Sequence, residues 1–314
     1  MGWLEIKVRV GSEDAATAVG ALFDRYGRGG AVYEQIYADG PDVPQGTAPP
    51  VTVKTYLSTT EGYQQQLQAL QKEILRVGEV HPCAPVEIKE LADEDWATAW
   101  RAFFRPQRIG KRFVVKLPDQ SYPVAEDQLL IHLQPGMAFG TGLHATTRMC
   151  LVCLEELVRP GHHLLDLGTG SGILAIGAAK LGAGHVLALD NDPIAVAVAR
   201  ENVSLNNLEN VIDVTEGSLD HLTSKDLHRF DGIVLNIIAE VIVEMMEQGL
   251  TSFLKPRGWL LASGILAQAQ RQVIAHFEGR GLLTVQRFQQ EEWVTLYGRQ
   301  AVSDTPARPI LEGA

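Results

Sequence analysis

The chain has 314 residues, of which 46% are hydrophobic and 21% charged, a composition that favours a folded globular protein over a disordered or fibrous one. Its formal net charge of −11 would repel nucleic-acid phosphates, so we expect no direct sequence-specific nucleic-acid binding. No apolar run is long enough to cross a bilayer, and the alternating start of the chain lacks the apolar region of a signal peptide. We therefore expect a cytoplasmic protein with no membrane partner.

Cysteine usage points to a reducing compartment. The three cysteines are Cys83, Cys150 and Cys153, and an odd count argues against a disulfide framework. Cys150 and Cys153 form a C-x-x-C, but they lie in an apolar helical pattern and no second Cys or His pair accompanies them. We interpret both as small buried core residues and predict no metal site.

The first ninety residues predict a small domain of their own. Trp3–Val10 alternates with the period of a strand, and Ser12 begins a helical pattern that ends near Tyr26. Further strands are expected at residues 31–37, 51–57 and 86–91, with a second helix between Ser58 and about Val77. This β-α-β-β-α-β order predicts a ferredoxin-like α+β domain over residues 1–91, and we expect it to bind or position a partner.

A linker is expected at residues 92–110. Asp93–Phe104 looks like a short helix, whose aromatics we expect to pack between domains: Trp96, Trp100, Phe103 and Phe104. The densest basic cluster also falls here, and we interpret it as a solvated face: Arg101, Arg105, Arg108, Lys111 and Arg112. Strands near residues 112–117 and 128–133 lead into the second domain.

The second domain, predicted over residues 111–299, alternates strands and helices at the spacing of parallel β-α-β units. Seven strands are expected at 163–167, 185–190, 211–215, 232–236, 259–263, 282–288 and 293–298. The main helices are expected at 172–181, 193–206, 239–249 and 267–279. A gap of hairpin length separates the last two strands, so we predict a doubly wound α/β sheet that ends in an antiparallel hairpin. Residues 300–314 are predicted to form a loose tail.

The chemistry concentrates where the first of these strands ends. Asp166 is followed by Gly168, Gly170 and Gly172, and then by a helix. Glycines permit a tight turn and the close approach of a ligand, and the N–H groups at the helix start favour a ligand carboxylate. Asp190 follows Gly168 by twenty-two residues, at the end of the next strand, where a carboxylate can bind a ribose diol.

The glycine spacing separates two kinds of nucleotide-derived cofactor. A dinucleotide fingerprint, G-x-G-x-x-G, would need glycine at position 173, which is Ile173. The observed G-x-G-x-G after Asp166 is instead typical of S-adenosylmethionine binders. We therefore predict S-adenosylmethionine as the cofactor, and Ile173 argues against a nicotinamide-dependent dehydrogenase.

Four segments resemble the ribosomal protein L11 methyltransferase family, in the family's own order: 134–151 (QPGMAFGTGLHATTRMCL), 164–174, 188–193 and 234–239. The resemblance reaches to about Arg299. Ala145, where the family usually has proline, and Ile238, where it often has leucine, are mild departures. The resemblance implies a seven-stranded Rossmann-like methyltransferase sheet and N-methylation of lysine side chains, with the α-amino group as a further acceptor. The implied partner is ribosomal protein L11, free or on the large subunit, docked by residues 1–91. Implied cofactor contacts are Thr147, Gly168, Asp190 and Asn236.

Several residues keep two interpretations. Phe139, with Gly140 and Gly142, belongs to a loop that we expect to fold over the cofactor. Thr147 either binds the methionine end of the cofactor or caps a helix. Asn236 either orients the substrate amine or caps the next helix, and His144 is either structural or functional. Asp213 and Glu216 are either adenine-side contacts or part of a solvated loop. Alignment and desolvation of a neutral amine supply much of the catalysis, so the reaction needs little acid–base apparatus. We identify no general base in the sequence.

Other functions remain open at this point. A methyltransferase of the same fold could act on a small molecule or on a different protein. A non-catalytic cofactor-binding module would carry the same glycine loop.

Overall fold

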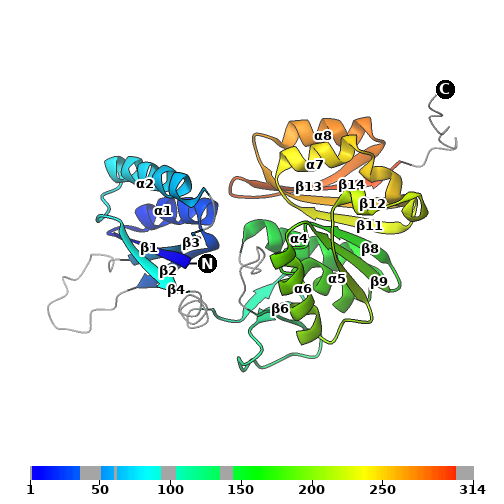
Figure 1. Cartoon of the computed structure of the whole chain (residues 1–314), viewed down its shortest axis with the longest axis horizontal. Coiled ribbons are helices and arrows are strands. Elements are labelled where there is room, and N and C mark those ends of the chain that lie inside the picture. The colour runs from blue at the N-terminus through cyan, green and yellow to red at the C-terminus, as the bar shows by residue number, and fades with distance from the viewer. Residues whose placement is uncertain (1, 36–50, 60–61, 93–103, 135–143, 302–314) are drawn as a thin grey trace. The chain divides into compact units, whose positions relative to one another are not determined.

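The computed structural model describes residues 2–35, 51–59, 62–92, 104–134 and 144–301 (Figure 1). The chain divides into two compact units. The first holds residues 1–107, 116–122 and 133–144, and the second holds the remainder. The predicted helix at 93–104 and the predicted tail fall largely outside the described residues. Within them, no helix is long and apolar enough to cross a membrane.

The first unit has the predicted ferredoxin-like order. Its described strands are β1 (Gly2–Val10), β2 (Arg28–Gln35), β3 (Val51–Ser58) and β4 (Glu87–Ala92), in the antiparallel order β2-β3-β1-β4. Its helices are α1 (Glu13–Tyr26) and α2 (Tyr63–Val80). Alternate residues of β1, Leu4, Ile6 and Val8, are buried in the core with residues of both helices. The Ser12 hydroxyl begins α1 by accepting a hydrogen bond from the Ala15 N–H at 3.2 Å.

The second unit contains the predicted large sheet. Its described strands are β8 (His163–Leu167), β9 (His185–Asp190), β10 (Ile212–Glu216), β11 (Phe230–Asn236), β12 (Leu254–Leu266), β13 (Leu282–Gln290) and β14 (Trp293–Gln300). Their order is β10-β9-β8-β11-β12-β14-β13, and β14 runs antiparallel to both its neighbours. The doubly wound α/β prediction and its terminal hairpin are therefore confirmed.

Helices cover both faces of this sheet, which buries its strands (Figure 1). Helices α4 (Ala145–Leu157), α5 (Ile173–Lys180) and α6 (Pro193–Leu205) lie on one face, and α7 (Ala239–Glu247) and α8 (Gln270–Gly279) on the other. Between β10 and β11 the chain forms only two short 3-10 helices, η1 (Leu219–His221) and η2 (Ser224–Asp226). A third, η3 (Leu250–Phe253), precedes β12.

A small sheet contains the two strands predicted near 112–117 and 128–133, together with a third strand that was not predicted. Strands β5 (Gln107–Ile109), β6 (Phe113–Lys116) and β7 (Leu129–His132) form a separate three-stranded sheet among the described residues, and β5 falls inside the predicted linker. The Glu155 carboxylate of α4 accepts hydrogen bonds from the N–H groups of Lys111 and Arg112 at 2.8–3.1 Å. These hydrogen bonds hold the β5–β6 turn against α4.

Candidate active site

The glycine loop at the end of β8 is fixed by its backbone. Gly168, Gly170 and Gly172 have φ angles of +73°, +56° and +80°, which L side chains rarely adopt. The N–H of Gly168 donates to the Leu189 carbonyl at 2.9 Å. A Cβ at Gly168 would lie 2.6 Å from Cγ2 of Ile237, so the loop also needs glycine for close packing.

Asp166 lies in β8 beneath this loop and is 2% exposed. Its Oδ2 accepts a hydrogen bond from the Thr169 hydroxyl at 2.7 Å, and its Oδ1 is buried without a hydrogen-bond partner among the described residues. Burial raises the pKa of Asp166 to about 6, against the opposing effect of Thr169. The backbone N–H of Ala175 also lowers this pKa, although no hydrogen bond of normal geometry joins it to the carboxylate. A second carboxylate, Asp190, raises it further.

Asp190 ends the neighbouring strand β9, where the sequence predicts it. Its Oδ2 accepts a hydrogen bond from the Gly170 N–H at 2.8 Å, and its Oδ1 accepts one from the Asp192 N–H at 3.0 Å. Each carboxylate oxygen can accept a second hydrogen bond, so the group stays available to a ligand. The carboxylate is thus held against the glycine loop at the carboxyl edge of the sheet.

Asn236 and Thr147, 89 residues apart in sequence, meet at the end of β11. The Asn236 Nδ2 donates to the Thr147 hydroxyl at 3.3 Å. Thr147 is fully buried on α4, and the Asn236 Oδ1 is buried without a hydrogen-bond partner among the described residues. A buried acceptor without a donor is costly, and such atoms are common where a ligand supplies the missing group.

Two buried hydroxyl residues that the sequence analysis did not single out lie near Asn236 and Thr147. Ser263 of β12 lies beside Asn236 in register, and its hydroxyl lies 3.4 Å from the Thr146 carbonyl of α4. The Thr295 hydroxyl of β14 lies 2.6 Å from that of Ser263. A single buried serine in an apolar strand gives no sequence signal, so only the fold reveals these contacts.

Ile237 is held between two glycines. Its side chain abuts Gly168, and its N–H donates to the Ser263 carbonyl at 3.2 Å. Gly264, at φ +81°, leaves room for the Ile237 carbonyl oxygen, which a Cβ there would overlap. The next residue, Ile238, is 60% exposed.

The structure does not place Asp213 or the predicted loop around Phe139 beside the glycine loop. Phe139, Gly140 and Gly142 lie outside the described residues. Asp213 lies within β10 rather than after it, pairs with Leu187 in register, and bonds Nε2 of His185 at 2.8 Å. Its position, before the carboxyl end of the strand, argues against the adenine-side interpretation.

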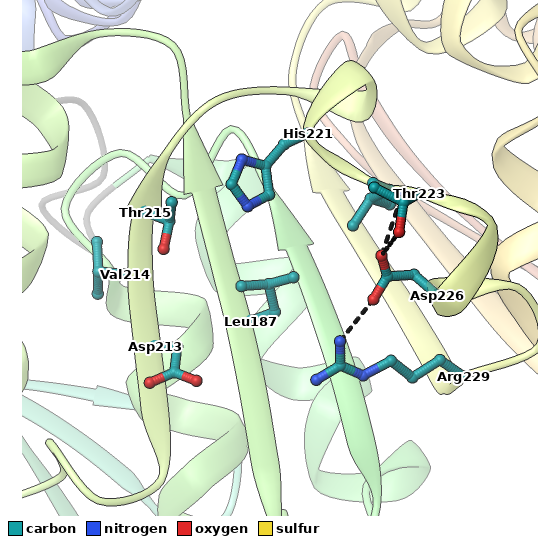
Figure 2. Close-up of a pocket in the computed structure, with 9 residues that line it drawn as sticks. Leu187, Asp213, Val214, Thr215, His221, Thr223, Asp226 and Arg229 are labelled. Carbon is teal, nitrogen blue, oxygen red and sulfur yellow. Dashed lines mark hydrogen bonds and ion pairs between the residues drawn. The ribbon is translucent and has the colours of Figure 1, made fainter.

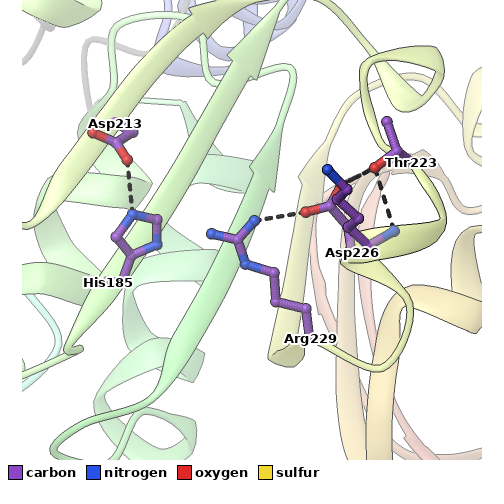
Figure 3. Close-up of polar contacts among 6 residues, drawn as sticks. His185, Asp213, Thr223, Asp226 and Arg229 are labelled. Carbon is purple, nitrogen blue, oxygen red and sulfur yellow. Dashed lines mark hydrogen bonds and ion pairs between the residues drawn. The ribbon is translucent and has the colours of Figure 1, made fainter.

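A groove of about 410 Å³ is lined by residues of β9, β10 and the segment between β10 and β11. Figure 2 shows its lining side chains around Leu187. Its charged groups are already paired: Arg229 bonds Asp226 at 2.6 Å, and Asp226 accepts hydrogen bonds from Thr223 (Figure 3). The Thr223 backbone hydrogen bond, with Arg229, holds the pKa of Asp226 below its usual value.

The interpretation of two cysteines as core residues is confirmed. Cys150 and Cys153 are 0% and 4% exposed. Burial raises the pKa of Cys153 to about 12 and that of Cys150 further still. Among the described residues, no group of three His, Cys, Asp or Glu side chains could hold a metal ion.

Comparison with known proteins identifies the family. Residues 2–301 match the ribosomal protein L11 methyltransferase family. A ribosomal protein L11 methyltransferase from Chloroflexus aurantiacus is 43% identical over 95% of this chain and 98% of its own, and one from Herpetosiphon aurantiacus is 40% identical over 96% and 100%. The crystal structure of a ribosomal protein L11 methylase from Lactobacillus delbrueckii subsp. bulgaricus is 32% identical, with a TM-score of 0.57, and covers 63% of this chain and 100% of its own. The chain therefore belongs to the ribosomal protein L11 methyltransferase family and is an S-adenosylmethionine-dependent methyltransferase.

Proposed function

We propose that the chain transfers methyl groups to lysine side chains of ribosomal protein L11, with the α-amino group as a further acceptor. The relatives' names support the substrate. The observation that carries the reaction is the Oδ1 of Asn236, which has no hydrogen-bond partner in the part of the chain that the structure describes, while Nδ2 bonds Thr147. The protein is proposed to act in the cytoplasm, on L11 that is free or part of the large subunit.

The residues around the loop fit S-adenosylmethionine. Gly168, Gly170 and Gly172 form a loop with positive φ angles, and the carboxylates of Asp166 and Asp190 adjoin it. We assign the ribose contact to Asp190, and contacts with the rest of the cofactor to Thr147, Asp166 and the three glycines, with Phe139 covering it. When bound, the cofactor supplies an electrophilic methyl group on a sulfonium.

Asn236 is proposed to orient the acceptor. Its Oδ1 accepts a hydrogen bond from the amine N–H, and the bond from Nδ2 to Thr147 keeps that oxygen facing the acceptor. A lysine amine has a pKa of about 10.4, so it loses a proton before it attacks. No side chain is assigned as its base, and water can accept this proton.

The first unit is proposed to dock L11 through residues 1–91. A protein substrate needs a second surface to place one lysine among many. Removal of residues 1–91 is expected to abolish methylation of L11 while affinity for S-adenosylmethionine is retained. Full activity of the shortened chain would favour a small-molecule substrate instead.

The proposal is tested by transfer of labelled methyl from S-adenosylmethionine to purified L11, followed by mass spectrometry. Methylated lysines are the expected product, and Asn236→Ala is expected to lower the rate about a hundredfold. Cofactor binding without any transfer would refute L11 as the substrate. An unchanged rate in Asn236→Ala would refute the role of Asn236.

A further inference from the structure

A small pocket beside the candidate active site combines apolar walls with an arginine that has no partner among the described residues. It measures about 180 Å³, enough for one large side chain, and lies between α4, the end of β5 and the end of β13. Its lining includes Ile109, Arg148, Met149, Val152, Phe288 and Gln290. Val152 is 36% exposed, so apolar surface is open to solvent here.

The guanidinium of Arg148 is half-buried and makes no hydrogen bond or ion pair with any residue that the structure describes. Arg229 in the larger groove differs, because Asp226 already pairs with it (Figures 2 and 3). A partly desolvated guanidinium gains most from a carboxylate, which it can bind through two parallel N–H donors. The pocket therefore offers one apolar site and one carboxylate site side by side.

The position of the pocket relates it to the reaction. Arg148 directly follows Thr147, whose hydroxyl accepts the hydrogen bond from Asn236, and consecutive Cα atoms are about 3.8 Å apart. Phe288 and Gln290 end β13, and β14 then places Val294 beside Ile265 near the carboxyl end of β12. The pocket thus opens near the carboxyl edge of the sheet, on the side of α4.

Building on the proposed function, we propose that this pocket binds the segment of the protein substrate next to the methylated lysine. An apolar side chain of that segment fills the pocket, and an adjacent Asp or Glu carboxylate pairs with Arg148. The net charge of −11 attracts a basic substrate as a whole and does not select which segment of it binds. One unpaired arginine near the reaction site instead selects a single register of the substrate.

The test compares Arg148→Gln with Arg229→Gln as the matched control, since both remove one arginine from a pocket of the same unit. Rates of methyl transfer are measured against the concentration of purified L11, and affinity for S-adenosylmethionine is measured by calorimetry. Arg148→Gln is expected to raise the KM for L11 about tenfold or more, with kcat changed less than about twofold and cofactor affinity unchanged. Arg229→Gln is expected to change none of these.

Val152→Phe provides a second test, because it fills the pocket and keeps the arginine. It is expected to raise the KM for L11 while thermal unfolding and cofactor affinity stay at the wild-type values. A wild-type KM in both Arg148→Gln and Val152→Phe would overturn the pocket assignment alone. A parallel loss of cofactor affinity in Arg148→Gln would overturn it too, because it would place Arg148 at the cofactor. Wild-type protein that binds the cofactor but never methylates L11 would refute the proposed function, and with it this substrate for the pocket.

Discussion

Replacement of Gly264 by alanine tests whether the backbone around Asn236 is as tightly held as the structure indicates. Gly264 has a φ of +81°, and a Cβ there would overlap the Ile237 carbonyl oxygen and lie 2.9 Å from its carbonyl carbon. Ile237 cannot retreat freely, because its N–H bonds the Ser263 carbonyl and its side chain abuts Gly168. The added methyl group should therefore displace Ile237, and with it the neighbouring Asn236.

The expected magnitude has two parts. A left-handed backbone costs an L residue about 1–2 kcal/mol, and relief of an overpacked contact costs about 1–3 kcal/mol more. Gly264→Ala should thus lower the free energy of unfolding by about 2–5 kcal/mol. A shift of about 1 Å at a positioning residue lowers kcat about a hundredfold, so we expect a loss of that order for L11 methylation.

Gly281→Ala is the matched control. Gly281 has a similar φ of +76°, but a Cβ there would meet nothing within 4 Å. It should lose only the backbone part, about 1–2 kcal/mol, and keep its kcat. Urea unfolding and steady-state methyl transfer measure both quantities. Equal losses of stability in the two variants, with kcat retained in both, would refute the argument that Ile237 is clamped.

Three further substitutions test the carboxylates and the buried hydroxyls. Asp190→Asn should weaken S-adenosylmethionine binding about tenfold to a hundredfold by calorimetry. The control Asp213→Asn should leave the affinity unchanged, and equal effects would refute the assignment of the ribose contact to Asp190. Burial raises the pKa of Asp166 to about 6 from 3.8, so the folded state holds an extra proton between these values and loses stability as pH rises through them. Between pH 4 and 7, urea unfolding should show wild-type protein losing about 2 kcal/mol relative to Asp166→Asn, and parallel pH curves would contradict this. Ser263→Ala should lower the free energy of unfolding by about 1–2 kcal/mol, since its hydroxyl bonds Thr295, and an unchanged urea midpoint would argue against that role.

The large sheet was predictable because its signals are local. Each buried strand is a short apolar run bounded by turn residues, and the helices between them follow a 3.6-residue period. Strand ends were less predictable. The sequence predicts 259–263 for a strand that runs over Leu254–Leu266, because Lys255 and Arg257 read as loop residues. Lys255 instead pairs with Asp231 at 2.8 Å, which lets charged residues extend β11 and β12.

The parts that sequence could not supply are contacts between distant segments. Nothing near Thr147 indicates that Asn236 will bond it, because that contact depends on α4 packing across β11 and β12. The small sheet was missed as a unit because β5 has only three residues, too few for a periodic signal. Its attachment depends on Glu155, an acidic residue that looks like any solvated helix position.

The two carboxylates at the candidate site show why a motif alone does not assign roles. Asp166 lies one residue before the end of β8, and Asp190 ends the neighbouring parallel strand β9. The fold buries Asp166 beneath the loop, where Thr169 binds one oxygen and burial raises the pKa. Asp190 instead accepts hydrogen bonds from two backbone N–H groups, those of Gly170 and Asp192, one on each carboxylate oxygen. Each Asp190 oxygen can accept a second hydrogen bond, which suits a ribose diol. Asp166 accepts a hydrogen bond from the loop through Oδ2 and keeps Oδ1 for another part of the cofactor.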